Sequence, residues 1–329
     1  MDIYGIGAAL VDTEIDLNDS DLNRLGIDKG VMTLVDESRQ RELLHALEGH
    51  LIHSRRASGG SAANTVIAAS YFGAKTFYSC RVANDDNGEF YLRDMAAANV
   101  QTHLHAGSMQ GTTGKCLVFI TPDAERTMNT YLGISEHIGE QDIDETALAS
   151  SRFAYIEGYL VTSASGRPAA IRTRELAQQH GVKIALSLSD PAMVNFFRDG
   201  LSEMIGAGVD ILFCNEAEAL GFTEQSELDT AVEQLKRCAK SFAITRGAKG
   251  ARIFDGDSVF DIAATPVKAV DSNGAGDMFA GAFLAALVKN WDYRKAGEFA
   301  CAAAATVVSQ YGPRLAPEQH AQLLDQHRH

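Results

Sequence analysis

Residues 271–283 read Asp-Ser-Asn-Gly-Ala-Gly-Asp-Met-Phe-Ala-Gly-Ala-Phe. Gly274, Ala275 and Gly276 have almost no side chain, so their backbone N–H groups can gather around one anion. The residues that follow, 278–287, are small and apolar and include no proline, which predicts a tightly packed helix. The stretch therefore indicates a glycine-rich turn that leads into a helix N-terminus, an arrangement suited to binding an oxyanion or a phosphate.

Asp277 follows directly on this turn. A carboxylate beside a phosphate site can accept the proton of a hydroxyl nucleophile, which is what a kinase requires. An acidic residue is also common in the cap or first turn of a helix. This stretch alone supports both interpretations equally.

A pair of glycines precedes another expected helix of small residues. Gly59 and Gly60 would let a ligand approach the backbone closely, and Asn64 can exchange hydrogen bonds with ligand hydroxyls. Asp12 follows the first expected strand, at the edge where ligands gather in α/β sheets, and its carboxylate can accept from two sugar hydroxyls. A tight turn with Ser61 as the N-cap, and a solvated turn aspartate, would explain the same residues.

Two more motifs follow expected strands. Asn215 and Glu218 are three residues apart and share one face of a helical turn, where an amide oxygen and a carboxylate can hold a hydrated Mg²⁺. Residues 245–250, Thr-Arg-Gly-Ala-Lys-Gly, form a glycine-rich turn that can lie against a nucleotide. The alternatives are a capped acidic helix start and a plain hairpin turn. The sequence contains no Gly-x-x-x-x-Gly-Lys-Ser/Thr loop, which excludes a P-loop enzyme.

Size, charge and cysteine content limit the class of protein. The chain has 329 residues, enough for a large α/β core, and its net charge of −14 disfavours nucleic acid and anionic membranes as partners. Five scattered cysteines without a Cys-x-x-Cys pair fit reduced thiols rather than disulfides or a zinc site. The N-terminus lacks a signal-peptide pattern and no apolar stretch approaches membrane-spanning length, so we expect a cytoplasmic protein.

Strand-like and helix-like segments alternate along most of the chain. This alternation predicts an α/β fold with a doubly wound, mostly parallel sheet flanked by helices. The expected strands are 3–9, 76–82, 153–156, 183–188, 211–214, 242–245 and 251–254. The expected helices are 37–48, 61–72, 87–98, 167–180, 192–203, 228–239, 275–289, 294–310 and 317–327.

Two segments break this alternation. Residues 10–36 look irregular to extended, and residues 101–134 alternate like antiparallel strands joined by turns. We expect them to form one small discontinuous β element, as a lid over an active site would. The core would then comprise residues 1–9, 37–100 and 135–329. A pair of ordinary surface hairpins is the alternative.

Together the motifs resemble the ribokinase-like (PfkB) family of carbohydrate and nucleoside kinases, in the family's order and spacing. Residues 271–277 resemble its C-terminal signature, Gly59-Gly60 with Asn64 its N-terminal signature, and Asn215 with Glu218 its metal motif. Segments 155–160 and 209–213 are similar to the adenosine kinase branch. Two segments depart from that branch: Ala8 stands where it usually has Asn, and 61–64 read Ser-Ala-Ala-Asn where it usually has Ser-Thr-Gln-Asn.

The resemblance implies a ribokinase-like fold and ATP-dependent phosphorylation of a nucleoside primary hydroxyl, adenosine to AMP, as in purine salvage. A sugar kinase acting on ribose, fructose or a related sugar is the alternative. Asp277 would be the catalytic base, and the amides of Gly274, Ala275 and Gly276 would form the anion hole.

The remaining roles also follow from the resemblance. Sugar hydroxyls would be held by Asp12, Gly59, Gly60 and Asn64, and Tyr159 would stack on a purine. Asn215 and Glu218 would organise Mg²⁺ through water, Thr245 and Gly247 would line the ATP site, and the backbone around Asp271 would hold a monovalent cation such as K⁺. In this family the lid either caps a monomer or pairs with a second lid in a homodimer.

Overall fold

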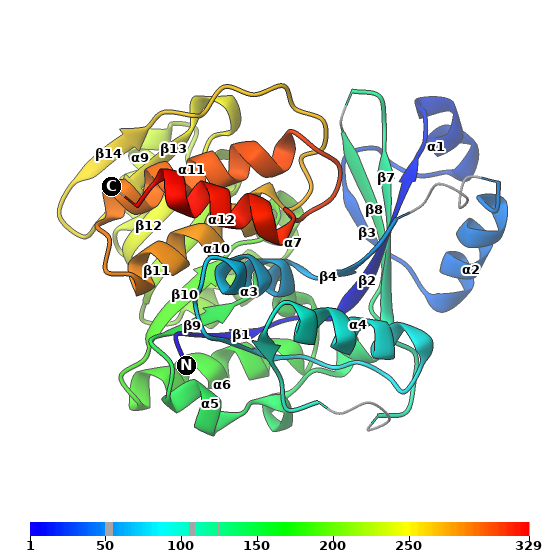
Figure 1. The fold of residues 1–329 in the computed structure, drawn as a ribbon, viewed down its shortest axis with the longest axis horizontal. Helices are drawn as coiled ribbons and strands as arrows, with labels where there is room; N and C mark the ends of the chain where they lie inside the picture. The colour runs from blue at the N-terminus through cyan, green and yellow to red at the C-terminus, as the bar shows by residue number, and fades with distance from the viewer. Residues whose placement is uncertain (50–54, 105–108, 124, 329) are drawn as a thin grey trace.

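The structure is a computed structural model that describes residues 1–49, 55–104, 109–123 and 125–328. In these residues the larger sheet has nine strands in the order β14-β13-β12-β11-β10-β9-β1-β5-β6 (Figure 1). All neighbouring pairs are parallel except β12–β13 and β13–β14. The strands are β1 Ile3–Ile6, β5 Thr76–Ser79, β6 Val100–Gln101, β9 Phe153–Ile156, β10 Lys183–Ser187, β11 Val209–Asn215, β12 Ala239–Thr245, β13 Ala251–Phe254 and β14 Val259–Ile262.

Helices cover both faces of this sheet, because successive strand residues point to opposite faces and both sets are apolar. One layer contains α3 Ser61–Tyr71, α4 Asp86–Ala97, α10 Ala275–Val288, α11 Tyr293–Val308 and α12 Pro317–Gln326. The other contains α5 Glu145–Ala149, α6 Gly166–Gln179, α7 Pro191–Ile205, α8 Glu216–Thr223 and α9 Leu228–Leu235. Short 3₁₀ turns lie at Gly133–His137, Glu140–Asp142, Gly158–Thr162 and Gly247–Lys249. The predicted doubly wound α/β architecture is confirmed.

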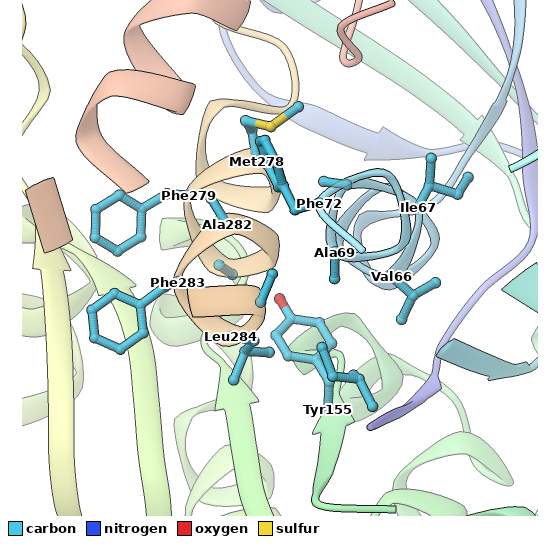
Figure 2. Close-up of a cluster of buried hydrophobic side chains, with 14 of the residues drawn as sticks. Val66, Ile67, Ala69, Phe72, Tyr155, Met278, Phe279, Ala282, Phe283 and Leu284 are labelled. Carbon is cyan, nitrogen blue, oxygen red and sulfur yellow. The ribbon is translucent and has the colours of Figure 1, made fainter. Parts of the chain in front are cut away.

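Part of the hydrophobic core lies between α3 and α10, the helices that carry Asn64 and Asp277 (Figure 2). A Cβ at Gly281 on α10 would be 2.5 Å from the carbonyl oxygen of Thr65 on α3, so the two helices are in close contact there. Phe279 and Phe283 stack on the sheet side of α10 with a ring-centroid distance of 5.9 Å. This packing fixes the beginning of α10 beside the beginning of α3.

A second, smaller sheet stands beside this core, in the order β3-β8-β7-β2-β4 (Figure 1). Its strands are β2 Leu10–Asp16, β3 Met32–Leu34, β4 Arg55–Gly59, β7 Gly114–Ile120 and β8 Arg126–Tyr131, and it carries α1 Asp19–Leu25 and α2 Glu37–Ala46. We call these seven elements the small sheet unit.

The borders of this unit differ from those expected. Residues 37–46 and 55–59, which the sequence placed in the core, belong to this unit instead: the first form α2, which packs on the small sheet, and the second form β4, which pairs with β2. The segment Arg-Arg-Ala-Ser-Gly is polar and lacks β-branched residues, so nothing in it indicated a strand. Residues 100–101 form β6 and belong to the larger sheet through β5, although 101 was expected to start the second lid segment.

Among the described residues no helix is long and apolar enough to cross a membrane.

One face of the small sheet packs under α1 and α2. Ile15, Leu117 and Phe119 are buried there against Leu22 and Leu43. The other face carries Asp12 and Cys116 and turns toward the larger sheet, and both residues line a cavity there. Among the described residues, the face under α1 and α2 is therefore covered, whereas the face toward the cavity keeps Leu34 46% exposed.

We therefore expect the purified protein to be a monomer of about the chain mass of 35.4 kDa, because the apolar face that a lid-to-lid dimer would need is already covered. Size-exclusion chromatography with light scattering measures this directly. A concentration-independent mass of twice that value would contradict the prediction and place the contact on another surface.

Candidate active site

The residues singled out in the sequence come together in one cavity of about 380 Å³ between the two sheets. It lies beyond the carboxyl ends of β9 to β12, where ligands bind in open parallel sheets. The expected site residues that line it are Asp12, Gly60, Asn64, Tyr159, Asn215, Glu218, Thr245, Gly274, Ala275, Gly276 and Asp277. Gly59 and Gly247 are not part of its lining, although Gly59 contacts Asp12.

Asp277 lies in the first turn of α10, with its carboxylate held by α3. Its Oδ1 accepts a hydrogen bond from Ser61 Oγ at 2.6 Å, and its Oδ2 accepts one from Asn64 Nδ2 at 3.0 Å. Burial raises the pKa of Asp277 above its ordinary value, while these two hydrogen bonds and the charges of Arg126 and Arg314 oppose the rise. A fixed carboxylate of increased basicity, partly open to a cavity, is suited to accepting a proton.

The glycine-rich turn before Asp277 has the geometry of an anion cradle. Gly274 has φ +72°, and a Cβ there would be 2.5 Å from the Pro313 carbonyl oxygen, so only glycine fits. A Cβ at Gly276 would meet nothing within 4 Å, which leaves its backbone open toward the cavity. The Ala275 amide already donates weakly to the Ser272 carbonyl at 3.4 Å. The first amides of a 14-residue helix therefore face the space beside Asp277.

The glycine pair is required by its neighbours as well as by its turn. A Cβ at Gly59 would lie 2.1 Å from Oδ1 of Asp12, and a Cβ at Gly60, with φ +99°, would lie 2.2 Å from the Ala8 carbonyl oxygen. Gly60 is the N-cap of α3, so Ser61 is not the cap and instead donates to Asp277. Burial raises the pKa of Asp12 to about 7, with the charge of Arg314 opposing the rise.

Asn215 and Glu218 form a reciprocal capping box at the start of α8. The Glu218 amide donates to Asn215 Oδ1 at 2.8 Å, and Asn215 donates to Glu218 through its backbone N at 3.0 Å and its Nδ2 at 2.6 Å. Burial raises the pKa of Glu218 to about 7, while the Asn215 backbone hydrogen bond opposes this. The capped acidic turn is thus present, and its carboxylate also lines the cavity.

This pair fits a hydrated Mg²⁺ but not a metal held by protein side chains alone. The described part of the chain contains no group of three or more His, Cys, Asp or Glu that could hold a metal ion. Mg²⁺ usually keeps several waters and takes one or two carboxylates together with substrate phosphates. One buried carboxylate at the edge of the cavity, Glu218, meets that requirement.

Tyr159 and Thr245 reach the cavity from the carboxyl ends of β9 and β12, which are separated in the sheet by β10 and β11. Tyr159 Oη donates to Asp190 Oδ2 at 3.4 Å, and its ring is half-buried in the lining. Thr245 Oγ1 donates to the Cys214 carbonyl at 3.5 Å. Gly247 has φ +54° and begins the 3₁₀ turn Gly247–Lys249, beside the cavity lining rather than in it.

Three charged residues of the site were not singled out by sequence reasoning. Glu157 lines the cavity and accepts from the amides of Ala8 at 3.2 Å and Ala62 at 2.7 Å, and burial raises its pKa to about 7. Its position directly after the apolar strand 153–156 was the same signal that identified Asp12. Arg126 reaches Asn273 from β8, and Arg314 reaches Asn64 from the loop before α12, with no local signal for either.

Two kinases are similar in sequence to most of this chain. An adenosine kinase of Saccharomyces cerevisiae is 25% identical over 334 residues, covering 95% of this chain and 96% of its own. A ribokinase of Staphylococcus aureus is 27% identical and covers 82% of this chain and 88% of its own.

Two solved structures are each 32% identical to this chain. The adenosine kinase of Sinorhizobium meliloti superposes with a TM-score of 0.91 and covers 98% of both chains. A probable sugar kinase of Rhizobium etli superposes with a TM-score of 0.90, covering 98% of this chain and 97% of that one. These neighbours share the complete fold.

The sequence profile of the pfkB family of carbohydrate kinases matches residues 33–320. That match covers most of the chain and includes the turn before Asp277, the capping box of α8 and the beginning of α3. The protein therefore belongs to the pfkB family of kinases, phosphotransferases that act on an alcohol group, as the resemblance of its motifs predicted.

Proposed function

We propose that this kinase transfers the γ-phosphoryl group of ATP to the primary 5′-hydroxyl of a nucleoside, with adenosine as substrate and AMP as product. The observation that carries the proposal is the two-part character of the cavity. Asp12, Asn64 and Asp277 form a polar end that suits a ribose. An apolar wall is formed by side chains of the small sheet and of the residue directly after β8, namely Leu10, Met32, Leu34, Met128 and Leu132. Tyr159 lines the cavity from beyond the end of β9. A free sugar has no group for such a wall, whereas a purine base does.

Asp277 would act as the base in this reaction. The substrate oxygen forms a bond to the γ-phosphorus, the bond from that phosphorus to the leaving ADP oxygen breaks, and the hydroxyl proton passes to the Asp277 carboxylate. Ser61 and Asn64 hold both carboxylate oxygens, so the acceptor is oriented before the substrate arrives. The amides of Gly274, Ala275 and Gly276 would face the negative charge on the transferred group.

Cofactor binding would use the strand ends beside this centre. Glu218, oriented by Asn215, would hold hydrated Mg²⁺, which would neutralise phosphate charge when bound. Thr245 and the neighbouring Gly247 would lie along the ATP. We place the monovalent cation near the backbone of Asp271. The buried Asp271 carboxylate accepts hydrogen bonds from the backbone N–H groups of Asn273 and Gly312, each with an N···O distance of 2.8 Å. A K⁺ titration in the kinase assay tests that placement.

A panel of acceptors, followed by ADP release, tests the substrate. We expect kcat/KM to be highest for adenosine, lower for other nucleosides and lowest for ribose and fructose. Leu34→Ala shortens a half-exposed side chain of the apolar wall and should lower kcat/KM for adenosine by about tenfold while leaving that for ribose unchanged. Phosphorylation of ribose or fructose with none of adenosine would establish the alternative, a sugar kinase.

Asp277→Asn removes the proton acceptor and keeps the shape of the side chain. We expect kcat to fall by about a hundredfold or more, because positioned general bases contribute on this scale. Activity of the wild-type protein should fall as pH decreases through the raised pKa of Asp277, since only the ionised carboxylate accepts a proton. Asp255→Asn, in an exposed turn, is the matched control and should leave kcat unchanged. Full activity of the Asp277 variant would refute the assignment.

Glu218→Gln tests the metal site. The amide keeps the size of the side chain but loses the charge, so the Mg²⁺ concentration for half-maximal activity should rise by about tenfold. Glu216→Gln is the control in the same helical turn, because Glu216 pairs with Arg246 and lies outside the cavity lining. Thermal unfolding of both variants separates a weakened helix cap from a weakened metal site. An unchanged Mg²⁺ requirement for a folded Glu218 variant would contradict the role.

A further inference from the structure

The loop between α11 and α12 packs directly on the turn that precedes the catalytic helix. The Gly312 amide donates to Asp271 Oδ2 at 2.8 Å, and the Pro313 Cα lies 2.7 Å from the Cβ position of Gly274. Gln310 Nε2 donates to the carbonyl oxygen of Arg314 at 3.1 Å, which closes the loop on itself. This loop is therefore held in place against the anion cradle from a distant part of the chain.

Arg314 extends from this loop into the interior. Its side chain is 15% exposed, Nη1 donates to Asp94 Oδ2 at 2.6 Å, and Nε donates to Asn64 Oδ1 at 3.1 Å. Asn64 in turn donates from Nδ2 to Asp277 at 3.0 Å. A continuous hydrogen-bonded series thus runs from the C-terminal loop to the carboxylate that we propose as the base.

The direction of this series is set by chemistry. A guanidinium group has only donors, so the atom of Asn64 that faces Arg314 must be its oxygen. The amide nitrogen of Asn64 must then face Asp277, where it can only donate. Without Arg314 the Asn64 amide could rotate by half a turn and present its oxygen to Asp277. That oxygen would repel an ionised Asp277 carboxylate and would accept a hydrogen bond from a protonated one.

We propose that Arg314 is a positioning residue of the kinase, which fixes the orientation of the Asn64 amide and thereby keeps Asp277 ionised and aligned. This inference rests on the proposed function of Asp277. Nothing in the local sequence around 314 indicates such a role, because its target lies 250 residues earlier in the chain.

The charge of Arg314 acts in the same direction. It opposes the rise in the pKa of both Asp12 and Asp277. The negative charge of Asp277, in contrast, raises the pKa of Asp12, and like charges act on each other in the same way. Arg126 on β8 also places a cation near Asp277. Glu157, directly after β9, is a nearby carboxyl group whose pKa is raised by burial and further by the charge of Asp277. Tyr155 and Tyr159 also lie near Asp277 as neutral phenols, because burial and, in addition, the charge of Asp277 raise the pKa of both. Loss of Arg314 leaves one arginine, Arg126, to offset Asp12 and Asp277.

The test compares pH profiles of kcat for wild type, Arg314→Met and Arg314→Lys with the best acceptor of the panel. For Arg314→Met we expect kcat to be about tenfold to a hundredfold lower, because the charged hydrogen bond from Arg314 to Asn64 is lost. We also expect the acid limb of the profile to move upward by about one pH unit, since a nearby cation has been removed. Arg314→Lys keeps the charge and should restore the acid limb while recovering only part of kcat.

Asp94→Asn is the matched control for a purely structural role. It weakens the contact that joins Arg314 to α4 but leaves the Arg314–Asn64 hydrogen bond, so it should lower the unfolding temperature at least as much as Arg314→Lys without moving the acid limb. A wild-type acid limb and kcat in Arg314→Met would overturn the inference. If Asp277→Asn were fully active, the proposed role of Asp277 as the base would fail, and this outcome is distinct because it does not involve Arg314.

Discussion

The contact between α3 and α10 is the constraint on which the site depends. Gly281 lies against the backbone of Thr65, and no larger residue fits there, because a Cβ would approach the carbonyl oxygen to 2.5 Å. Such close contact between helices requires small residues along both, and the two sequences supply them. As a result Ser61 and Asn64 meet Asp277 across more than 200 residues of sequence, at hydrogen-bonding distance. The geometry of the proposed catalytic site is here a consequence of helix packing.

The sequence predicted the larger sheet well because its signals are local. Buried parallel strands are short apolar runs, and the helices between them alternate in a regular manner, so element type and order could be read from periodicity. The small sheet unit was harder. β4 carries Arg56 and Ser58 and pairs with β2 through its backbone, and α2 covers Phe119 from outside. Which surface an amphipathic helix covers is decided by tertiary packing, and periodicity does not contain that information.

In the site, too, local signals were predicted from the sequence and long-range contacts were not. Gly59 and Gly60 were expected to let a ligand approach the backbone, whereas the reason that Gly59 must be glycine is its contact with the carboxylate of Asp12. For Asn215 and Glu218 the two interpretations were not exclusive, because the helix cap holds the carboxylate that lines the cavity. Arg126 and Arg314 were missed because each acts on a partner more than 140 residues away, Asn273 and Asn64 respectively.

The cavity also imposes a cost on the fold. Burial raises the pKa of Asp12, Glu157 and Glu218 to about 7, so each carboxylate is harder to ionise in the folded protein than in the unfolded chain. Because the unfolded state loses these protons at lower pH, each group reduces the free energy of unfolding as pH rises from about 4 to about 7, and the reduction is constant above that. The two apolar helix layers must offset this loss at neutral pH. Arg314, and to a smaller extent Arg126, limits this loss for Asp12. The cation that we propose to orient Asn64 therefore also lessens the cost of burying a carboxylate in the cavity.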